Sequence, residues 1–130
     1  MEPRPFVVGL VRTIVRVEVA GGGAREADVA QHILPRLHQA FAMLIGPGGF
    51  DVLLARTIVL ARRAHPILVG VGAGPAGTLT RLDDVARDEV AFEEGVMAIV
   101  TQFMELLVAL IGEDLALRLV RNAWPEEEEK

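Results

Sequence analysis

Hydrophobic residues recur at helical spacing over most of this chain. The clearest example is residues 24–45, where apolar positions repeat every three or four residues and polar side chains fill the opposite side. The same spacing predicts helices at 50–64, at 83–111 and from Glu113 onward. The expected fold class is therefore mainly α, a compact bundle of about five helices that forms one domain over residues 6–125.

Residues 6–19 fit two patterns. Apolar residues at the start of this segment recur at helical spacing, whereas Val15, Val17 and Val19 alternate with polar residues as they would in a strand. β-branched side chains favour a strand locally. We favour a helix, because a single strand needs a partner and the rest of the chain has helical periodicity.

Proline and glycine set the expected boundaries. Pro35 lies inside the first helical pattern, where it removes a backbone hydrogen bond, so we expect a kink or a break near residues 31–34. Residues 46–49 should form a loop, and Gly112 a hinge or stop before the last helix. The glycine-rich segment 67–80 should form a short hairpin or an ordered loop.

The two ends differ from the body of the chain. Residues 1–5 hold two prolines and should form an irregular arm, and the acidic tail 126–130 is expected to be disordered. The N-terminal residues lack the basic start of a signal peptide, and the chain has no cysteine, so we expect a cytoplasmic protein. The use of arginine almost to the exclusion of lysine is typical of GC-rich bacterial coding.

Composition excludes several kinds of chemistry. A net charge of −5 gives no basic footprint for nucleic acid. The absence of serine, cysteine and tyrosine excludes these nucleophiles, disulfides and thiolate metal sites. The only lysine is Lys130 in the tail, which argues against Schiff-base chemistry. Asp, Glu, His and Arg would suffice for acid–base catalysis, but no convergent set of them is apparent, so we expect no enzyme and no catalytic residue.

Histidine and carboxylate spacing gives no metal motif. His32 and His38 are six residues apart and do not share a helical face well, and His65 precedes a proline. The Glu-x-x-His spacing of carboxylate metal bundles does not occur. The acidic residues of 83–94 lack the spacing of a calcium loop and are expected to form a solvated helix face. We therefore expect neither a metal nor a cofactor.

One short motif resembles a nucleotide-binding sequence. Gly72, Gly74 and Gly77 match G-x-G-x-x-G, and the apolar residues 67–69 before them could form a strand. This string resembles the dinucleotide fingerprint of FAD- and NAD-binding proteins, which implies a pyrophosphate held at a helix N-terminus. That fingerprint also requires a βαβ unit, and no stretch of suitable length remains. The favoured alternative is a flexible or hairpin connection that uses glycine for positive φ.

The segment 95–112 is apolar over most of its circumference, with a thin polar stripe that includes Gln102 and Glu105. The stripe either faces water or a second subunit, or lines a small pocket, and Arg56 and Arg118 are the candidate partners of its polar groups. The segment approaches the length of a bilayer span. A central acid is costly in a membrane, however, so we expect a core helix rather than a membrane span.

The hydrophobic content of 52% is high for a small bundle, so apolar helix faces should bury against a second copy or another protein. We expect a non-enzymatic interaction, adaptor or regulatory module that self-associates through its C-terminal helices. Met43, Met97 and Met104 could add an adaptable surface. The candidate interface residues are Leu115, Leu119, Val120 and Trp124, the last as an anchor.

The alternative function is binding of a small apolar or nucleotide-like ligand between helices. In that case the polar contacts would come from Gln102, Glu105 or the loop that holds Gly72, Gly74 and Gly77.

Overall fold

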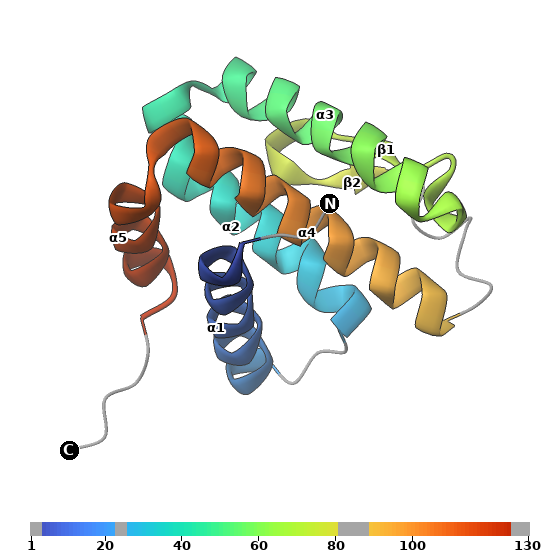
Figure 1. The fold of residues 1–130 in the computed structure, drawn as a ribbon, viewed down its shortest axis with the longest axis horizontal. Helices are drawn as coiled ribbons and strands as arrows, with labels where there is room; N and C mark the ends of the chain where they lie inside the picture. The colour runs from blue at the N-terminus through green and yellow to red at the C-terminus, as the bar shows by residue number, and fades with distance from the viewer. Residues whose placement is uncertain (1–3, 23–25, 81–88, 126–130) are drawn as a thin grey trace.

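The computed structural model describes residues 4–22, 26–80 and 89–125. Within them, five α-helices form a bundle and a two-stranded hairpin follows the third helix (Figure 1). The mainly α fold with about five helices is thus confirmed, as is a short hairpin within 67–80. The helices are α1 (Pro5–Gly22), α2 (Glu26–Ile45), α3 (Pro47–Ala64), α4 (Glu89–Ile111) and α5 (Glu113–Ala123).

The hairpin pairs two strands of two residues each. β1 (Gly72–Ala73) runs antiparallel to β2 (Leu79–Thr80). Two single 3₁₀ turns complete the segment, η1 (Pro66–Leu68) before β1 and η2 (Pro75–Gly77) between the strands.

Helices α2 and α4 form the centre of the bundle, and each of them packs against all the other helices. Phe41 of α2, Phe50 of α3 and Phe103 of α4 are fully buried, and the rings of Phe50 and Phe103 lie 4.9 Å apart. Such a core stabilises the fold mainly through the apolar area that it removes from water.

Helix α4 owes its position to its composition. By length and composition alone, Glu94–Ile111 could cross a membrane, the one such window in the described part of the chain. In this structure 44% of that window is buried inside the bundle. Its most hydrophobic residues, such as Phe103 and Leu107, pack in the core formed with α1, α2 and α3.

The N-terminal segment is helical, so the preference for a helix over a strand at 6–19 is confirmed. The irregular arm ends one residue earlier than expected, because Pro5 is already the first residue of α1. Proline suits that position, since the missing N–H would have no helical partner there. Residues 1–3 of the arm and the tail 126–130 lie outside the described residues.

Of the kink or break expected near 31–34, the break does not occur. Helix α2 continues through Pro35, although a proline costs the helix one backbone hydrogen bond. Ile33, Leu34 and Leu37 on either side of the proline are all fully buried. The packing of these residues outweighs the tendency of proline to interrupt a helix, because their burial stabilises the fold by more than one backbone hydrogen bond does.

The loop expected at 46–49 is a single residue in the structure. Gly46, at φ +83°, alone separates α2 from α3, and Pro47 begins the next helix. The Phe50 amide donates to the Gly46 carbonyl at 2.9 Å, so the two glycines that follow Pro47 belong to the first helical turn. Gly112, at φ +94°, separates α4 from α5 in the same way, as the sequence predicted.

Candidate functional site

Helix α5 has one buried side, one charged side and an apolar flank between them. Ala116 and Val120 face the core and are buried. Leu115 and Leu119 are spaced four residues apart and are half-buried, so they form one flank of the helix, and Leu119 faces the groove beside α2. The charged residues of its outer side, Glu113, Asp114, Arg118 and Arg121, are exposed.

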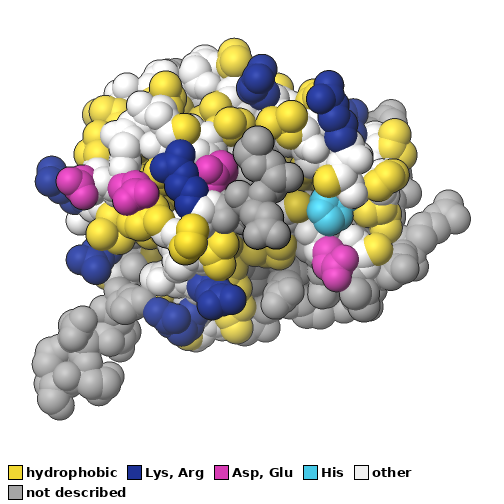
Figure 2. Space-filling view, viewed as in Figure 1, with side chains coloured by type: hydrophobic (Ala, Val, Ile, Leu, Met, Phe, Trp, Pro, Cys, Tyr) yellow, Lys and Arg dark blue, Asp and Glu magenta, His cyan; other side chains and the backbone are white. Residues whose placement is uncertain are grey.

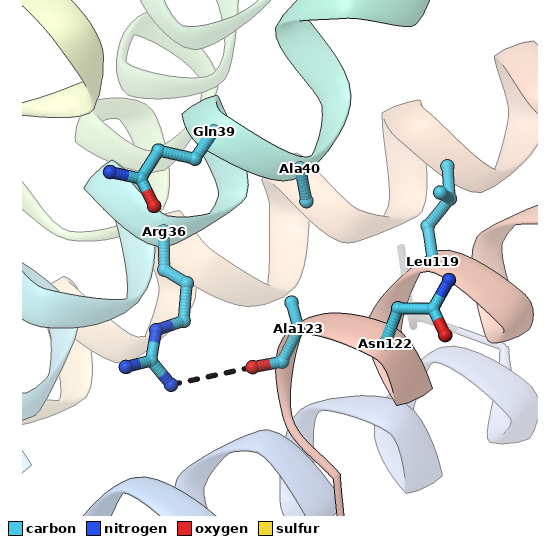
Figure 3. Close-up of a pocket in the computed structure, with 6 residues that line it drawn as sticks. All are labelled: Arg36, Gln39, Ala40, Leu119, Asn122 and Ala123. Carbon is cyan, nitrogen blue, oxygen red and sulfur yellow. Dashed lines mark hydrogen bonds between the residues drawn. The ribbon is translucent and has the colours of Figure 1, made fainter.

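A groove of about 340 Å³ runs between α2 and α5 (Figure 3). Its apolar wall is formed by Ala40 on α2 with Leu119 and Ala123 on α5. Polar side chains of Arg36, Gln39 and Asn122 complete the lining. The groove is open to solvent, which suits a docking surface better than an enclosed ligand cavity.

Arg36 closes one end of the groove. Its Nη1 donates to the carbonyl oxygen of Ala123 at 3.4 Å, as Figure 3 shows, and lies 3.4 Å from Oε2 of Glu18 on α1. The guanidinium carbon is 5.8 Å from the centroid of the Trp124 ring. The indole Nε1 of Trp124 donates to the same Glu18 oxygen at 2.7 Å. These contacts connect α1, α2 and the end of α5.

The apolar surface extends beyond the groove at the C-terminal end of α2. Arg36, Gln39, Ala40 and Met43 lie on one side of α2, because their spacing is that of successive helical turns. The Met43 side chain is 95% exposed, the most exposed large hydrophobic residue described, and its neighbour Leu44 is 48% exposed. Exposed apolar side chains that continue a groove are typical of interaction surfaces.

The predicted interface residues divide into two pairs. Leu115 and Leu119 are partly exposed on the flank of α5, and Leu119 lines the groove. Val120 and Trp124 are 1% and 0% exposed, so their side chains belong to the core of this chain. Both residues also line a second pocket of about 440 Å³ between α1 and α5. The expectation of Trp124 as an interface anchor is corrected accordingly. The hydrogen bond to Glu18 permits this burial, because it satisfies the indole N–H inside the protein.

Glu105 has a different partner from the two arginines that the sequence suggested. The backbone N–H of Arg4 donates to its Oε1 at 3.3 Å, and Nε of Arg4 donates to its Oε2 at 3.0 Å. Nη1 of Arg4 also lies 3.8 Å from Oε2 of Glu113. Arg4 therefore attaches the start of α1 to the α4–α5 junction. Gln102, one turn before Glu105, is half-buried, and neither residue lines the groove between α2 and α5.

The three glycines of the G-x-G-x-x-G motif lie in the hairpin. Gly72 is in β1, Gly74 follows that strand, and Gly77 ends η2. A strand, β2, follows the glycines, where the dinucleotide fingerprint requires a helix N-terminus. The motif is therefore a hairpin connection, and the resemblance to a nucleotide-binding loop does not extend to the structure.

A tight turn explains the glycine at position 77. The Thr78 amide donates to the Pro75 carbonyl at 3.1 Å, and the two residues between them have φ +55° at Ala76 and +83° at Gly77. These angles are those of a type I′ turn, which needs positive φ at both central residues. A Cβ on Gly77 would lie 2.5 Å from the Leu34 carbonyl oxygen, so the turn packs directly on α2.

Metal-binding residues do not gather in the described part of the chain, where no group of three or more His, Asp or Glu side chains could hold an ion. His38 packs its ring edge-on against Phe50, with centroids 4.8 Å apart. Asp83, Asp84 and Asp88 of the acidic run lie outside the described residues, and Glu94 is exposed.

The candidate site thus contains residues that local spacing did not single out. Arg36 and Glu18 are ordinary polar positions on amphipathic helices, and only the contact between elements far apart in the sequence gives them a role. Comparison of the chain with protein-family models, with curated proteins and with solved structures gives no match.

Proposed function

We propose that this chain is a non-enzymatic helical interaction module of the cytoplasm that pairs with a second copy of itself through the groove between α2 and α5. One observation carries the proposal. The apolar wall formed by Ala40, Leu119 and Ala123 is open to solvent and continues into Met43, which is 95% exposed. Burial of a side chain of that size stabilises an interface by about 1.5–3 kcal/mol.

The charges on α5 favour a second copy as the occupant. The outer side of this helix carries Glu113 and Asp114 at its start and Arg118 and Arg121 in its second half. Antiparallel pairing of two α5 helices about a twofold axis brings the acidic end of each against the basic half of the other. Within the described residues, Asp114, Arg118 and Arg121 have no ion-pair partner, so all three are available to a second chain.

The same charge order also suits the dipole of α5 on its own, since acids stabilise a helix start and cations its end. The dipole does not account for the apolar flank beside the charges. Leu115 and Leu119 remain half-exposed on this flank, and Leu119 lines the groove. The combination of an apolar flank with an outer side of opposite charges at its two ends is what a self-complementary interface requires.

Sedimentation equilibrium of the purified chain tests this proposal. We expect wild type to form a dimer that dissociates on dilution, and Leu119→Glu to remain monomeric, because a carboxylate in the apolar wall is desolvated without a partner. The matched control is Val69→Glu, since Val69 is 68% exposed on the segment between η1 and β1. A wild type that stays monomeric up to high micromolar concentration, or a Leu119→Glu dimer as tight as wild type, refutes the proposal.

A further inference from the structure

Helix α3 has an outward stripe that combines apolar and basic side chains. Val52 is 70% exposed and Val59 is 42% exposed. Arg56 and Arg63 are exposed at spacings of four and eleven residues from Val52, and Arg62 is half-exposed beside them. These spacings place the residues along one side of the helix, over three successive turns.

The arginines of α3 differ from those that hold the bundle together. Arg4 and Arg36 each contact a carboxylate within 4 Å, whereas no ion pair or side-chain hydrogen bond joins Arg56, Arg62 or Arg63 to another described residue. The guanidinium groups of Arg56 and Arg63 therefore keep their donors free along this stripe, on a chain whose net charge is −5.

The helix dipole explains only part of this arrangement. Arg62 and Arg63 lie in the last turn of α3, where cations stabilise the negative helix end. Arg56 lies in the middle of the helix, and the two exposed valines contribute nothing to the dipole. In Figure 2 dark-blue and yellow side chains alternate along the upper edge of the molecule, where α3 runs in Figure 1.

We infer that this side of α3 is a second docking surface, and that its occupant is an acidic amphipathic segment of a partner protein. The carboxylates of such a segment would meet Arg56 and Arg63 in charge-assisted, bidentate pairs. Its apolar residues would cover Val52 and Val59. Charge complementarity carries this assignment. A stripe of arginine and valine repels a basic partner, and a purely apolar partner would bury the arginines without supplying opposite charges.

The second surface is separate from the one proposed for self-association. Helix α3 runs along the top of the bundle in Figure 1, and its arginine-bearing half lies on the opposite side of the view from α5. A chain that pairs with itself through α5 would still present the side of α3 that carries Arg56 and Arg63 to another protein. Binding at α3 therefore does not require the proposed dimer.

Fluorescence anisotropy with a defined peptide tests the inference. The probe is a labelled peptide of about 16 residues with glutamate and leucine at helical spacing, long enough to form a helix when bound. We expect wild type to bind it at least about tenfold more tightly than the same peptide with lysine in place of glutamate, and added salt to weaken the complex. Arg56→Glu should weaken binding by about tenfold, and Arg56→Gln by less.

Arg12→Glu is the matched control, because Arg12 is an exposed residue of α1 and the variant changes the net charge equally. Equal losses in Arg12→Glu and Arg56→Glu would show a response to overall charge and overturn the assignment. Two further results would also overturn it. One is stronger Arg56-dependent binding to vesicles rich in phosphatidylserine than to the peptide, and the other is conversion of the wild-type oligomer to monomers by Arg56→Glu.

Discussion

The indole Nε1 of Trp124 donates a hydrogen bond of 2.7 Å to Oε2 of Glu18, a residue 106 positions earlier in the chain. The same oxygen lies 3.4 Å from Nη1 of Arg36, so one carboxylate holds groups from α2 and from the end of α5. The Glu18 side chain is only 12% exposed. A carboxylate in that position depends on its partners, because burial without them carries a desolvation cost.

Trp124→Phe tests the importance of this hydrogen bond. Phenylalanine keeps most of the buried ring but leaves Glu18 without its indole donor, so we expect a loss of about 1–3 kcal/mol in the free energy of unfolding. Urea unfolding followed by circular dichroism measures the loss. Wild type should also show the blue-shifted fluorescence of a fully buried indole, since Trp124 is the only tryptophan.

A smaller effect is expected at the ion pair between Arg4 and Glu105. The two side chains are 40% and 21% exposed, so solvent screens their attraction and Glu105→Gln should cost no more than about 1 kcal/mol. Added salt should reduce the difference from wild type. Glu94→Gln serves as the control, because Glu94 is exposed on the same helix. If Glu105→Gln lowers the free energy of unfolding by well over about 1 kcal/mol, solvent screens the pair far less than its exposure indicates.

Two glycines of the hairpin segment allow backbone strain to be separated from steric overlap. Gly70 and Gly77 have similar φ values of +95° and +83°, but a Cβ meets no atom within 4 Å at Gly70 and lies 2.5 Å from the Leu34 carbonyl oxygen at Gly77. We expect Gly70→Ala to cost about 1–2 kcal/mol from its conformation alone, and Gly77→Ala to cost clearly more. Thermal unfolding of the two variants compares them directly. Equal losses of stability in the two variants would mean that the turn does not pack tightly against α2.

The helices were predictable because their periodicity is local, whereas the errors concern contacts between distant elements. Nothing in the spacing around Pro35 indicates that the buried residues on both sides keep α2 continuous. The interior position of Trp124 depends on Glu18, which is far away in sequence. The half-exposed Leu119 beside the groove followed from the amphipathic pattern of α5, so the candidate surface could be predicted in part.

The charge order of α5 leads to the sharpest test of antiparallel pairing. In a twofold pair the Asp114 of one chain faces the Arg118–Arg121 half of the other, so each reversal of one charge acts at two symmetric places. We expect Asp114→Arg and Arg121→Asp each to weaken self-association by about tenfold in the dissociation constant.

The two substitutions together should restore self-association, since the reversed charges are again opposite across the twofold axis. Sedimentation equilibrium of the four proteins at low salt gives the comparison. Additive weakening in the double variant would refute antiparallel contact between Asp114 and Arg121. If wild type and all three variants dimerise equally, the interface lies elsewhere on the molecule, because exposed charges outside an interface contribute little to its affinity.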